Sequence, residues 1–413
     1  MGENETSIFF DGFQSNSLIQ LDTTMGKQAP GANREINLMH TMQQPIRILM
    51  LFTILNRGGA ETIAMNYYRN MDRSKVQFDF MVHRPERGAY EDEIEQLGGK
   101  IYRMLPVHPL YFKKYQKQIS RFFDEHPEYR IIHGHCSELG YFVYKEAAKR
   151  NIPFIIAHAH LSSAFIDIKW PFRMFFKYGM RKYINQYFAC SKDAAKWLFG
   201  KYLGEKAVIQ NNAIEPTNFA YSAETRKQVR EQWGIPEDTL VLGHVGRMDK
   251  QKNHRFILDI FEAYHQKHSN SKLMLVGDGE LYPSIQKEVE RKGLTEQMML
   301  LGTRSDVPQL MQAMDVFLFP SYFEGLGVVL IEAQAASLPC LVSDRIPKEA
   351  FITDLIQAKS LDAKVSEWVE GIEALWVHER KADDAERIKE KGYSIQEQAE
   401  WLQNYYLNLS RIP

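Results

Sequence analysis

The sequence predicts an α/β protein of two domains, each built on a doubly wound parallel sheet. The chain has 413 residues, which is more than one ordinary domain needs and enough for two hydrophobic cores. Short apolar runs alternate with helical patterns, as expected when helices connect parallel strands. This alternation breaks at residues 211–222, where two consecutive asparagines and Pro216 predict a linker between the domains.

Composition and charge limit the cellular compartment and the kinds of partner that we expect. No apolar run is long enough to span a membrane and the N-terminus lacks a secretory signal pattern, so we expect a cytoplasmic protein. Cys136, Cys190 and Cys340 stand far apart, which predicts reduced, buried thiols. Residues 45–218 carry 26 Lys and Arg against 17 Asp and Glu, whereas residues 219–413 carry 23 against 30. The positive charge of the first half is consistent with binding of nucleic acid, an anionic membrane surface or an anionic substrate. Ordinary variation in composition explains it as well.

The order of the elements gives the expected domain boundaries. We expect a disordered leader at 1–44, a first domain at 45–218, a second domain at 219–392 and a C-terminal helix at 393–413. Apolar runs predict the strands of the first domain at residues 46–54, 78–82, 100–104, 131–135, 154–157, 186–190 and 207–210. The segments between them predict helices that end near residues 68 and 150, and others at 90–97, 111–125 and 192–199.

Two of these strands are followed by candidate ligand-binding residues. Gly58 and Gly59 lie in a loop between a strand and a helix and would let backbone N–H groups approach a phosphate or sugar, although a plain tight turn explains them equally well. His158 and His160 follow a later strand, at the sheet edge where ligands bind. They could donate to a sugar hydroxyl or phosphate, or simply cap the strand. Because no acidic or cysteine partner is near, we expect no metal there.

Residues 169–182 form a cationic and aromatic segment. Lys169, Arg173, Lys177 and Arg181 recur every fourth residue, which draws a cationic stripe along a helix, and aromatic residues flank it. Such a helix suits the surface of an anionic bilayer. The alternative is a surface helix whose aromatic side chains pack into its own domain.

The second domain repeats the alternation of strands and helices. Its expected helices are at 225–233, 254–268, 307–314, 366–377 and 383–391, followed by the last helix at 395–409. Its expected strands are at 240–245, 316–319 and 340–343, and two further segments, 272–279 and 298–304, each combine a strand with a loop. Arg247 and Lys252 follow the first of these strands and suit a diphosphate leaving group, although charged loop residues can equally be solvated.

The most informative stretch runs from residue 315 to residue 339 and reads as a buried strand, a glycine turn and a helix. Gly325 and Gly327 allow close backbone approach, and the helix from about Val328 offers free N–H groups to an anion. Glu324 and Glu332 on either side of the turn can accept hydrogen bonds from sugar hydroxyls. A ligand that fits these groups has a polyol at each end and phosphate between them, which is the chemistry of a nucleotide-sugar. No P-loop and no Asp-x-Asp pair occurs, which argues against a phosphotransferase and against a bound Mg²⁺ or Mn²⁺.

Taken in order, these motifs make the chain resemble the retaining glycosyltransferase family four over about residues 46–413. That family has the GT-B architecture of two facing Rossmann-like domains. The resemblance is carried most specifically by Gly302-Thr-Arg-Ser-Asp-Val307, Asp315-Val-Phe-Leu-Phe-Pro-Ser321 and the Glu324 to Glu332 spacing. It is supported by Gly58-Gly-Ala-Glu61, Gly246-Arg247 with Lys252-Asn253, and Gly277-Asp-Gly279. Ser337 and Gly327 replace the glycine and proline of many relatives, at positions away from the expected chemistry.

The resemblance implies roles for individual residues. Arg247 and Lys252 would hold the donor diphosphate, Glu332 the ribose, and Glu324 the transferred sugar. His158 or His160 would lie near the reacting sugar, and the spacing leaves open which one. The remaining donor-side residues implied are Gly58, Gly59, Gly246, Gly277, Thr303, Arg304, Gly325, Leu326, Gly327 and Val328.

The resemblance also implies the reaction. We expect a retaining, metal-independent transfer of a sugar to a lipid-linked glycan acceptor. The expected donor is a nucleotide-sugar that carries UDP. Residues 343–349 resemble the branch that builds bacterial capsule or exopolysaccharide, which would place the protein peripherally at the inner face of the membrane. No cofactor and no nucleic acid partner is expected. Two alternatives remain open: a GT-B nucleotide-sugar epimerase and a catalytically silent subunit that binds a sugar-nucleotide.

Overall fold

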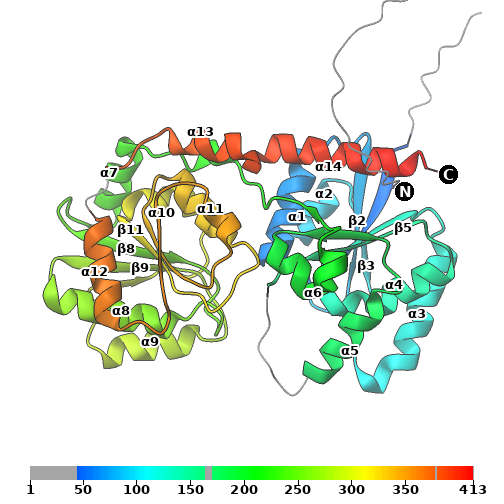
Figure 1. Cartoon of the computed structure of the whole chain (residues 1–413), viewed down its shortest axis with the longest axis horizontal. Helices are drawn as coiled ribbons and strands as arrows, with labels where there is room; N and C mark the ends of the chain where they lie inside the picture. Colours follow the sequence, from blue (N-terminus) through cyan, green and yellow to red (C-terminus); the bar gives the residue numbers. More distant parts are fainter. Residues whose placement is uncertain (1–43, 163–169, 377–378, 413) are drawn as a thin grey trace, which may run out of the picture. The chain divides into compact units, whose positions relative to one another are not determined.

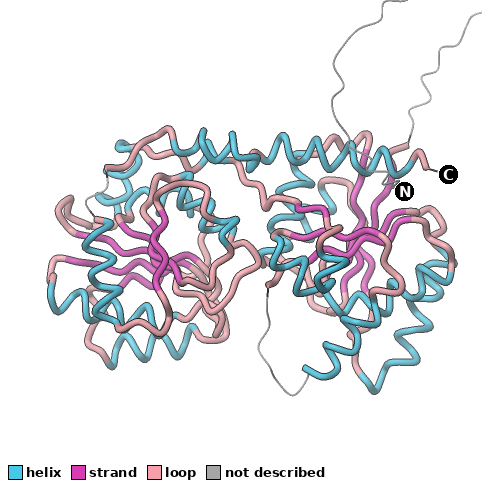
Figure 2. Tube along the Cα trace, viewed as in Figure 1, coloured by secondary structure: helices cyan, strands magenta, loops and turns pink. Residues whose placement is uncertain are grey.

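A computed structural model describes residues 44–162, 170–376 and 379–412 of the chain. Two parallel sheets carry helices on their faces (Figures 1 and 2), so the predicted doubly wound α/β class is confirmed. The first sheet has the order β3-β2-β1-β4-β5-β6-β7 and the second β10-β9-β8-β11-β12-β13. The predicted leader lies outside the described residues except for Gln44.

The first sheet forms because most residues of its strands are apolar and buried, as parallel strands covered by helices require. Its strands are β1 (Ile46–Phe52), β2 (Val76–Val82), β3 (Ile101–Arg103), β4 (Ile131–Gly134), β5 (Phe154–Ala159), β6 (Gln186–Ala189) and β7 (Val208–Ile209). Its helices are α1 (Gly59–Asn70), α2 (Glu91–Gln96), α3 (Phe112–Glu125), α4 (Tyr141–Lys149), α5 (Trp170–Met180) and α6 (Lys192–Gly204), with short 3-10 turns η1 (Pro109–Tyr111) and η2 (Ser137–Gly140).

The second sheet is built in the same way. Its strands are β8 (Leu240–Val245), β9 (Ser271–Val276), β10 (Met298–Leu300), β11 (Val316–Phe319), β12 (Cys340–Ser343) and β13 (Ile356–Lys359). Its helices are α7 (Ala223–Gln232), α8 (His254–Lys267), α9 (Tyr282–Arg291), α10 (Val307–Ala313), α11 (Val328–Ala335), α12 (Val365–Leu375) and α13 (Asp384–Ile388), with 3-10 turns η3 (Pro216–Asn218) and η4 (Lys348–Ala350). The edge strand β13 has no continuous apolar run, which is why its sequence did not predict it.

Asp315 fixes the start of β11, the strand that leads into the glycine turn. Its carboxylate accepts hydrogen bonds from Arg226, Arg230 and the backbone N–H of Val241, each at 2.7 Å. Two guanidinium groups and one N–H satisfy this largely buried carboxylate, so the pairing of β11 with β8 is tied to helix α7. The strand that precedes Glu324 is therefore held rigidly.

The last helix, α14 (Ile395–Ser410), packs against the first sheet. Its Tyr406 hydroxyl hydrogen-bonds Nδ1 of His133 at 2.6 Å and its ring lies edge-on to Phe78. The predicted helix at 383–391 is wrong at its end: α13 stops at Ile388 and a π-helical turn, η5 (Lys389–Tyr393), follows. Gly392 has a φ of 82° there, a left-handed conformation that ends regular helix and lets the chain enter α14.

Two further expectations can be compared with the structure. The three cysteines are unpaired and buried, as predicted. The predicted cationic segment contains α5, whereas Lys169 lies outside the described residues. Among the helices that the structure describes, none combines the length and the apolar character needed to cross a bilayer.

Candidate functional site

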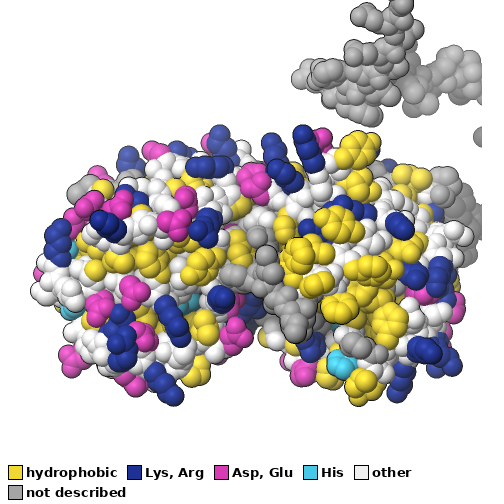
Figure 3. Space-filling model, turned by 60° about the horizontal axis from the view of Figure 1, so that its bottom comes forward, with side chains coloured by type: hydrophobic (Ala, Val, Ile, Leu, Met, Phe, Trp, Pro, Cys, Tyr) yellow, Lys and Arg dark blue, Asp and Glu magenta, His cyan; other side chains and the backbone are white. Residues whose placement is uncertain are grey.

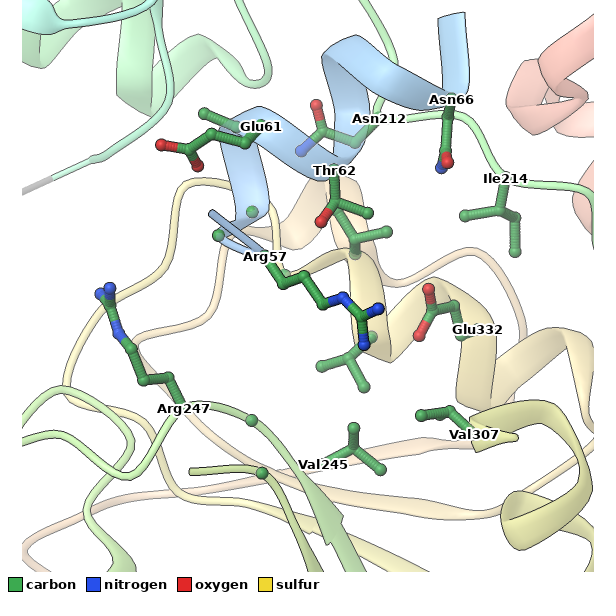
Figure 4. Close-up of a pocket in the computed structure, with 18 of the residues that line it drawn as sticks. Arg57, Glu61, Thr62, Asn66, Asn212, Ile214, Val245, Arg247, Val307 and Glu332 are labelled. Atoms are coloured by element: carbon green, nitrogen blue, oxygen red, sulfur yellow. The ribbon is translucent and has the colours of Figure 1, made fainter. Parts of the chain in front are cut away.

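A cavity of 1080 Å³ lies at the carboxyl ends of the strands of both sheets. The first sheet contributes the loop after β1 with the start of α1, and the residues that follow β4 and β5. The second contributes the loops after β8, β9, β10 and β11 and the start of α11. Ligands of open parallel sheets bind at this edge. Figure 4 shows charged and polar side chains converging on this cavity from both walls.

The cavity brings together almost every site residue that the sequence predicts. Those that line it are Gly58, Gly59, His160, Gly246, Arg247, Lys252, Gly277, Thr303, Arg304, Glu324, Gly325, Leu326, Gly327, Val328 and Glu332. His158 does not line it. These residues come from segments up to 274 positions apart, between Gly58 and Glu332, and meet because the carboxyl ends of the strands of both sheets border one cavity.

Lys252 and Glu324 form an ion pair at the edge of this cavity. The Lys252 Nζ atom lies 2.7 Å from Oε1 of Glu324, and Gln251 donates to the other carboxylate oxygen at 3.2 Å. The Glu324 residue is 5% exposed, so its carboxylate is oriented by these two donors in a poorly solvated place. Lys252 is thus positioned by Glu324 and is less mobile than its place in a loop suggests.

Glycine is required at the two positions of the turn for different physical reasons. Gly327 has a φ of 83° and precedes α11, a conformation that favours glycine at the helix start. Gly325 instead makes a close approach, because a Cβ atom there would lie 1.9 Å from the carbonyl oxygen of His160. Ser191 donates to the Gly325 carbonyl at 2.7 Å, and the Ser162 hydroxyl donates to the Glu324 carbonyl. Segments of the first sheet therefore hold the turn that carries Glu324.

Glu332 lies one turn into α11 and faces the cavity (Figure 4). Burial raises the pKa of its carboxyl group to about 7. Within the described residues its carboxylate has no hydrogen-bond or ion-pair partner, so it is available to accept hydrogen bonds from a ligand.

Arg247 and Arg57 enter the cavity from opposite walls (Figure 4). The Arg247 side chain is 69% exposed and donates to Asp249 at 2.9 Å. Glu61, in the first turn of α1, has a pKa raised to about 7 by burial, while its own backbone N–H and Arg247 oppose that rise. Arg57 and Glu61 were not predicted as site residues. Both flank the predicted glycine loop, and the signal that could have found them is charge at the start of a helix facing a ligand edge.

The histidines form a row along one face of β4 and β5. His133 pairs with Ile156 across the strands, so His133 and His135 share a face with His158 and His160. His160 lines the cavity and its Nε2 atom lies 2.7 Å from Nδ1 of His135. His158 is 1% exposed and lies deeper, 3.2 Å from His133. The structure thus brings His160 into the site and keeps His158 out.

These histidines are neutral at pH 7. Burial lowers the pKa of His160 to about 4 and the pKa of His133, His135 and His158 well below the usual range. Nitrogen atoms of the latter three lie within 4.8 Å of one another, but among the described residues no carboxylate joins them. His160 can therefore act as a neutral hydrogen-bonding group, oriented by His135.

Two protein-family models match this chain. "Glycosyltransferase Family 4" matches residues 57–244 and "Glycosyl transferases group 1" matches residues 225–394. The putative glycosyltransferase EpsF of Bacillus subtilis is 32% identical over 371 residues, which cover 87% of this chain and 96% of EpsF. The capsular polysaccharide biosynthesis glycosyltransferase CapH of Staphylococcus aureus is 23% identical over 333 residues, 78% of this chain and 87% of CapH.

Two further comparisons involve a sugar-nucleotide or a nucleotide by name. An Escherichia coli UDP-Gal:alpha-D-GlcNAc-diphosphoundecaprenol alpha-1,3-galactosyltransferase is 25% identical over 255 residues, 58% of this chain and 65% of that protein. The crystal structure of Anabaena HepE in complex with UDP has the same fold, with a TM-score of 0.71 and 17% identity over 88% of this chain and all of that chain.

Proposed function

Because this chain belongs to the group 1 and family 4 glycosyltransferases, we propose that it transfers a sugar from a UDP-sugar to a lipid-linked glycan acceptor, with retention at the anomeric carbon. The observation that carries the proposal is the single cavity that contains Arg247, the Lys252–Glu324 pair, Glu332 and the start of α11. It offers cations for phosphate and carboxylates for hydroxyl groups, which is the chemistry of a nucleotide-sugar.

The donor would bind with its diphosphate between Arg247, Lys252 and the N–H groups that open α11. These groups stabilise the negative charge that develops on the leaving diphosphate, so no metal ion is needed for that step. Glu332 would accept hydrogen bonds from the ribose and Glu324 from the transferred sugar. The UDP assignment is supported by the UDP-Gal donor named for the E. coli relative and by the UDP bound in the HepE crystal structure.

Retention would follow from attack on the same face of the sugar that the diphosphate leaves. Double displacement needs a free carboxylate on the far face of the sugar, whereas Glu324 is held by Lys252 and Gln251 and Glu332 is assigned to the ribose. We therefore assign the acceptor proton to the leaving phosphate oxygen. Neutral His160 would hydrogen-bond the reacting sugar from the first sheet.

The lipid-linked acceptor is supported by an exposed aromatic face on α5. Phe172 and Phe175 are 68% and 67% exposed, and Tyr178 on the same helix is exposed as well. Figure 3 shows hydrophobic side chains gathered with Lys and Arg side chains on this face. Aromatic residues next to cations suit an anionic bilayer, and we place the enzyme at the inner membrane face. The name of CapH supports a role in surface polysaccharide biosynthesis.

The membrane contact predicts that Phe172→Ser with Phe175→Ser will reduce co-sedimentation with phosphatidylglycerol vesicles by more than half. The reason is lost insertion of two aromatic side chains into the interface. The matched control is Trp376→Ser, which removes an exposed aromatic residue from the other domain and should change nothing. Unchanged sedimentation of the double variant would refute the contact.

The donor assignment is tested by a thermal-shift panel of UDP-, GDP-, ADP- and dTDP-sugars. We expect UDP-glucose or another UDP-sugar to raise the Tm by several degrees, since saturation at about 100 times Kd adds about 2.7 kcal/mol. The shift should grow from pH 6 to pH 8, because Glu332 has a pKa of about 7 and accepts best when ionised.

Glu332→Gln is the control that assigns this pH dependence. The variant should bind UDP-glucose more weakly at pH 8 and lose most of the pH dependence, whereas a dependence that persists would assign it to Glu61, whose pKa is also about 7. Absence of any shift across the panel would reject the donor site. Conversion of a UDP-sugar with no acceptor present would favour the epimerase.

A further inference from the structure

A second cavity, of 710 Å³, lies beside the first and has no role in the chemistry described above. It is bounded by α5, α6 and the residues that precede Glu324. Among the residues that the structure describes, four cationic side chains line it, those of Lys177, Arg181, Lys196 and Arg345, against the one carboxylate of Asp193. Such an excess of cations around a cavity favours an anionic ligand.

Lys177 is the most informative of these cations. The residue is 6% exposed, and its ammonium group lies 4.2 Å from the centre of the Trp197 ring. No described carboxylate or carbonyl oxygen lies within ion-pair or hydrogen-bond distance of it. The contact with Trp197 explains where the ammonium lies, but aromatic faces do not satisfy its three N–H donors.

Arg181 lies four residues after Lys177, so the two cations repel each other when no anion is bound between them. Its Nε atom is buried and has no partner among the described residues, although another of its nitrogens donates to Leu198 at 3.0 Å. Burial and the neighbouring Arg181 lower the pKa of Lys177, and like charges at this spacing repel. A bound anion would relieve the repulsion and could accept a hydrogen bond from the buried Nε of Arg181.

The second cavity meets the first at the Phe323–Glu324 peptide. Phe323 lines the second cavity and Glu324 the first, and Ser162, which lines the second, donates to the Glu324 carbonyl. The second cavity also includes Tyr178, which belongs to the exposed aromatic face of α5. The cationic cavity therefore adjoins both the first cavity and an apolar surface.

We propose that the second cavity binds the diphosphate of the acceptor, with the acceptor sugar directed to the first cavity and the lipid chain along the aromatic face of α5. This inference rests on the proposed function and adds a binding site to it. Lys177 and Arg181 are the residues that bind the anion, and Trp197 holds the Lys177 ammonium toward it. A cation site that adjoins both the first cavity and an apolar face matches the diphosphate of a lipid diphospho-sugar, which links the sugar to the lipid chain.

The test is calorimetric titration of the full chain with farnesyl diphosphate, in saturating UDP so that the first cavity is filled. Lys177→Gln is expected to raise the Kd for farnesyl diphosphate at least tenfold, and Arg181→Gln to raise it several-fold. Lys182→Gln is the matched control, because it removes an exposed cation next to Arg181 that does not line the cavity. Its Kd should be unchanged, and the Kd for UDP should be unchanged in all three variants.

Several outcomes would overturn the inference. Equal affinity of wild type and Lys177→Gln would do so, and so would binding of farnesol as tight as that of farnesyl diphosphate. If only the binding to phosphatidylglycerol vesicles depended on Lys177, the site would be assigned to a lipid headgroup. If only the binding of inorganic diphosphate depended on Lys177, the site would be assigned to free phosphate. Lys177→Arg keeps the charge and should keep binding, which separates a misfolded variant from a lost site. Failure of UDP to bind would reject the donor proposal, while titration without UDP would still report on the second cavity.

Discussion

Lys252→Ala is expected to lower kcat by about 10³-fold. The ammonium group has two functions in the proposed mechanism: it stabilises the leaving diphosphate and it orients the Glu324 carboxylate at 2.7 Å. Loss of one preorganised donor in a site with little water costs about 10²–10³ in rate, and loss of the Glu324 orientation adds to it. The measurement is kcat and KM with saturating acceptor, together with the Tm.

The Tm separates the two functions of Lys252. Removal of the cation leaves the poorly exposed Glu324 carboxylate without its ion pair, so Lys252→Ala should also lower the Tm. Adding Glu324→Gln should restore most of the Tm but none of the rate. Lys250→Ala, on the same loop but outside the cavity lining, is the matched control and should have nearly wild-type kcat. Wild-type turnover in Lys252→Ala would show that this lysine does not serve the reaction.

Gly325→Ala should lower kcat/KM by about 100-fold or more and should lower the Tm. The added methyl carbon would lie 1.9 Å from the carbonyl oxygen of His160, and because the obstacle is backbone the turn itself must move. A displacement of about 1 Å in a reacting group is enough for a loss of this size, and overpacking typically costs about 1–3 kcal/mol.

Gly59→Ala is the matched control for this substitution. It also adds one methyl group to a glycine that lines the cavity, but a Cβ atom there meets nothing within 4 Å. Because Gly59 begins α1, alanine should leave the Tm unchanged or raise it slightly. Equal effects of the two substitutions would show that close packing at Gly325 does not position Glu324.

Local patterns were sufficient for most of the fold. Apolar runs predicted β1, β5 and β11, because buried parallel strands need mostly apolar side chains. Two elements were not predicted correctly. The edge strand β13 lacks such a run, and the π-helical turn after Ile388 depends on how the chain must bend to reach α14.

The sequence by itself determined which residue types surround the donor cavity, because the glycine, arginine, lysine and glutamate positions follow strand ends and parallel strands share one edge. Only the tertiary structure decided how those residues act on one another. The depth of two histidines on one strand face puts His160 in the cavity and His158 in the interior. The pairing of Lys252 with Glu324 and the contact of the Lys177 ammonium with the Trp197 ring depend on distances between segments separated in sequence. Hydrogen bonds and burial act over a few ångströms in space, and no pattern along the chain records those distances.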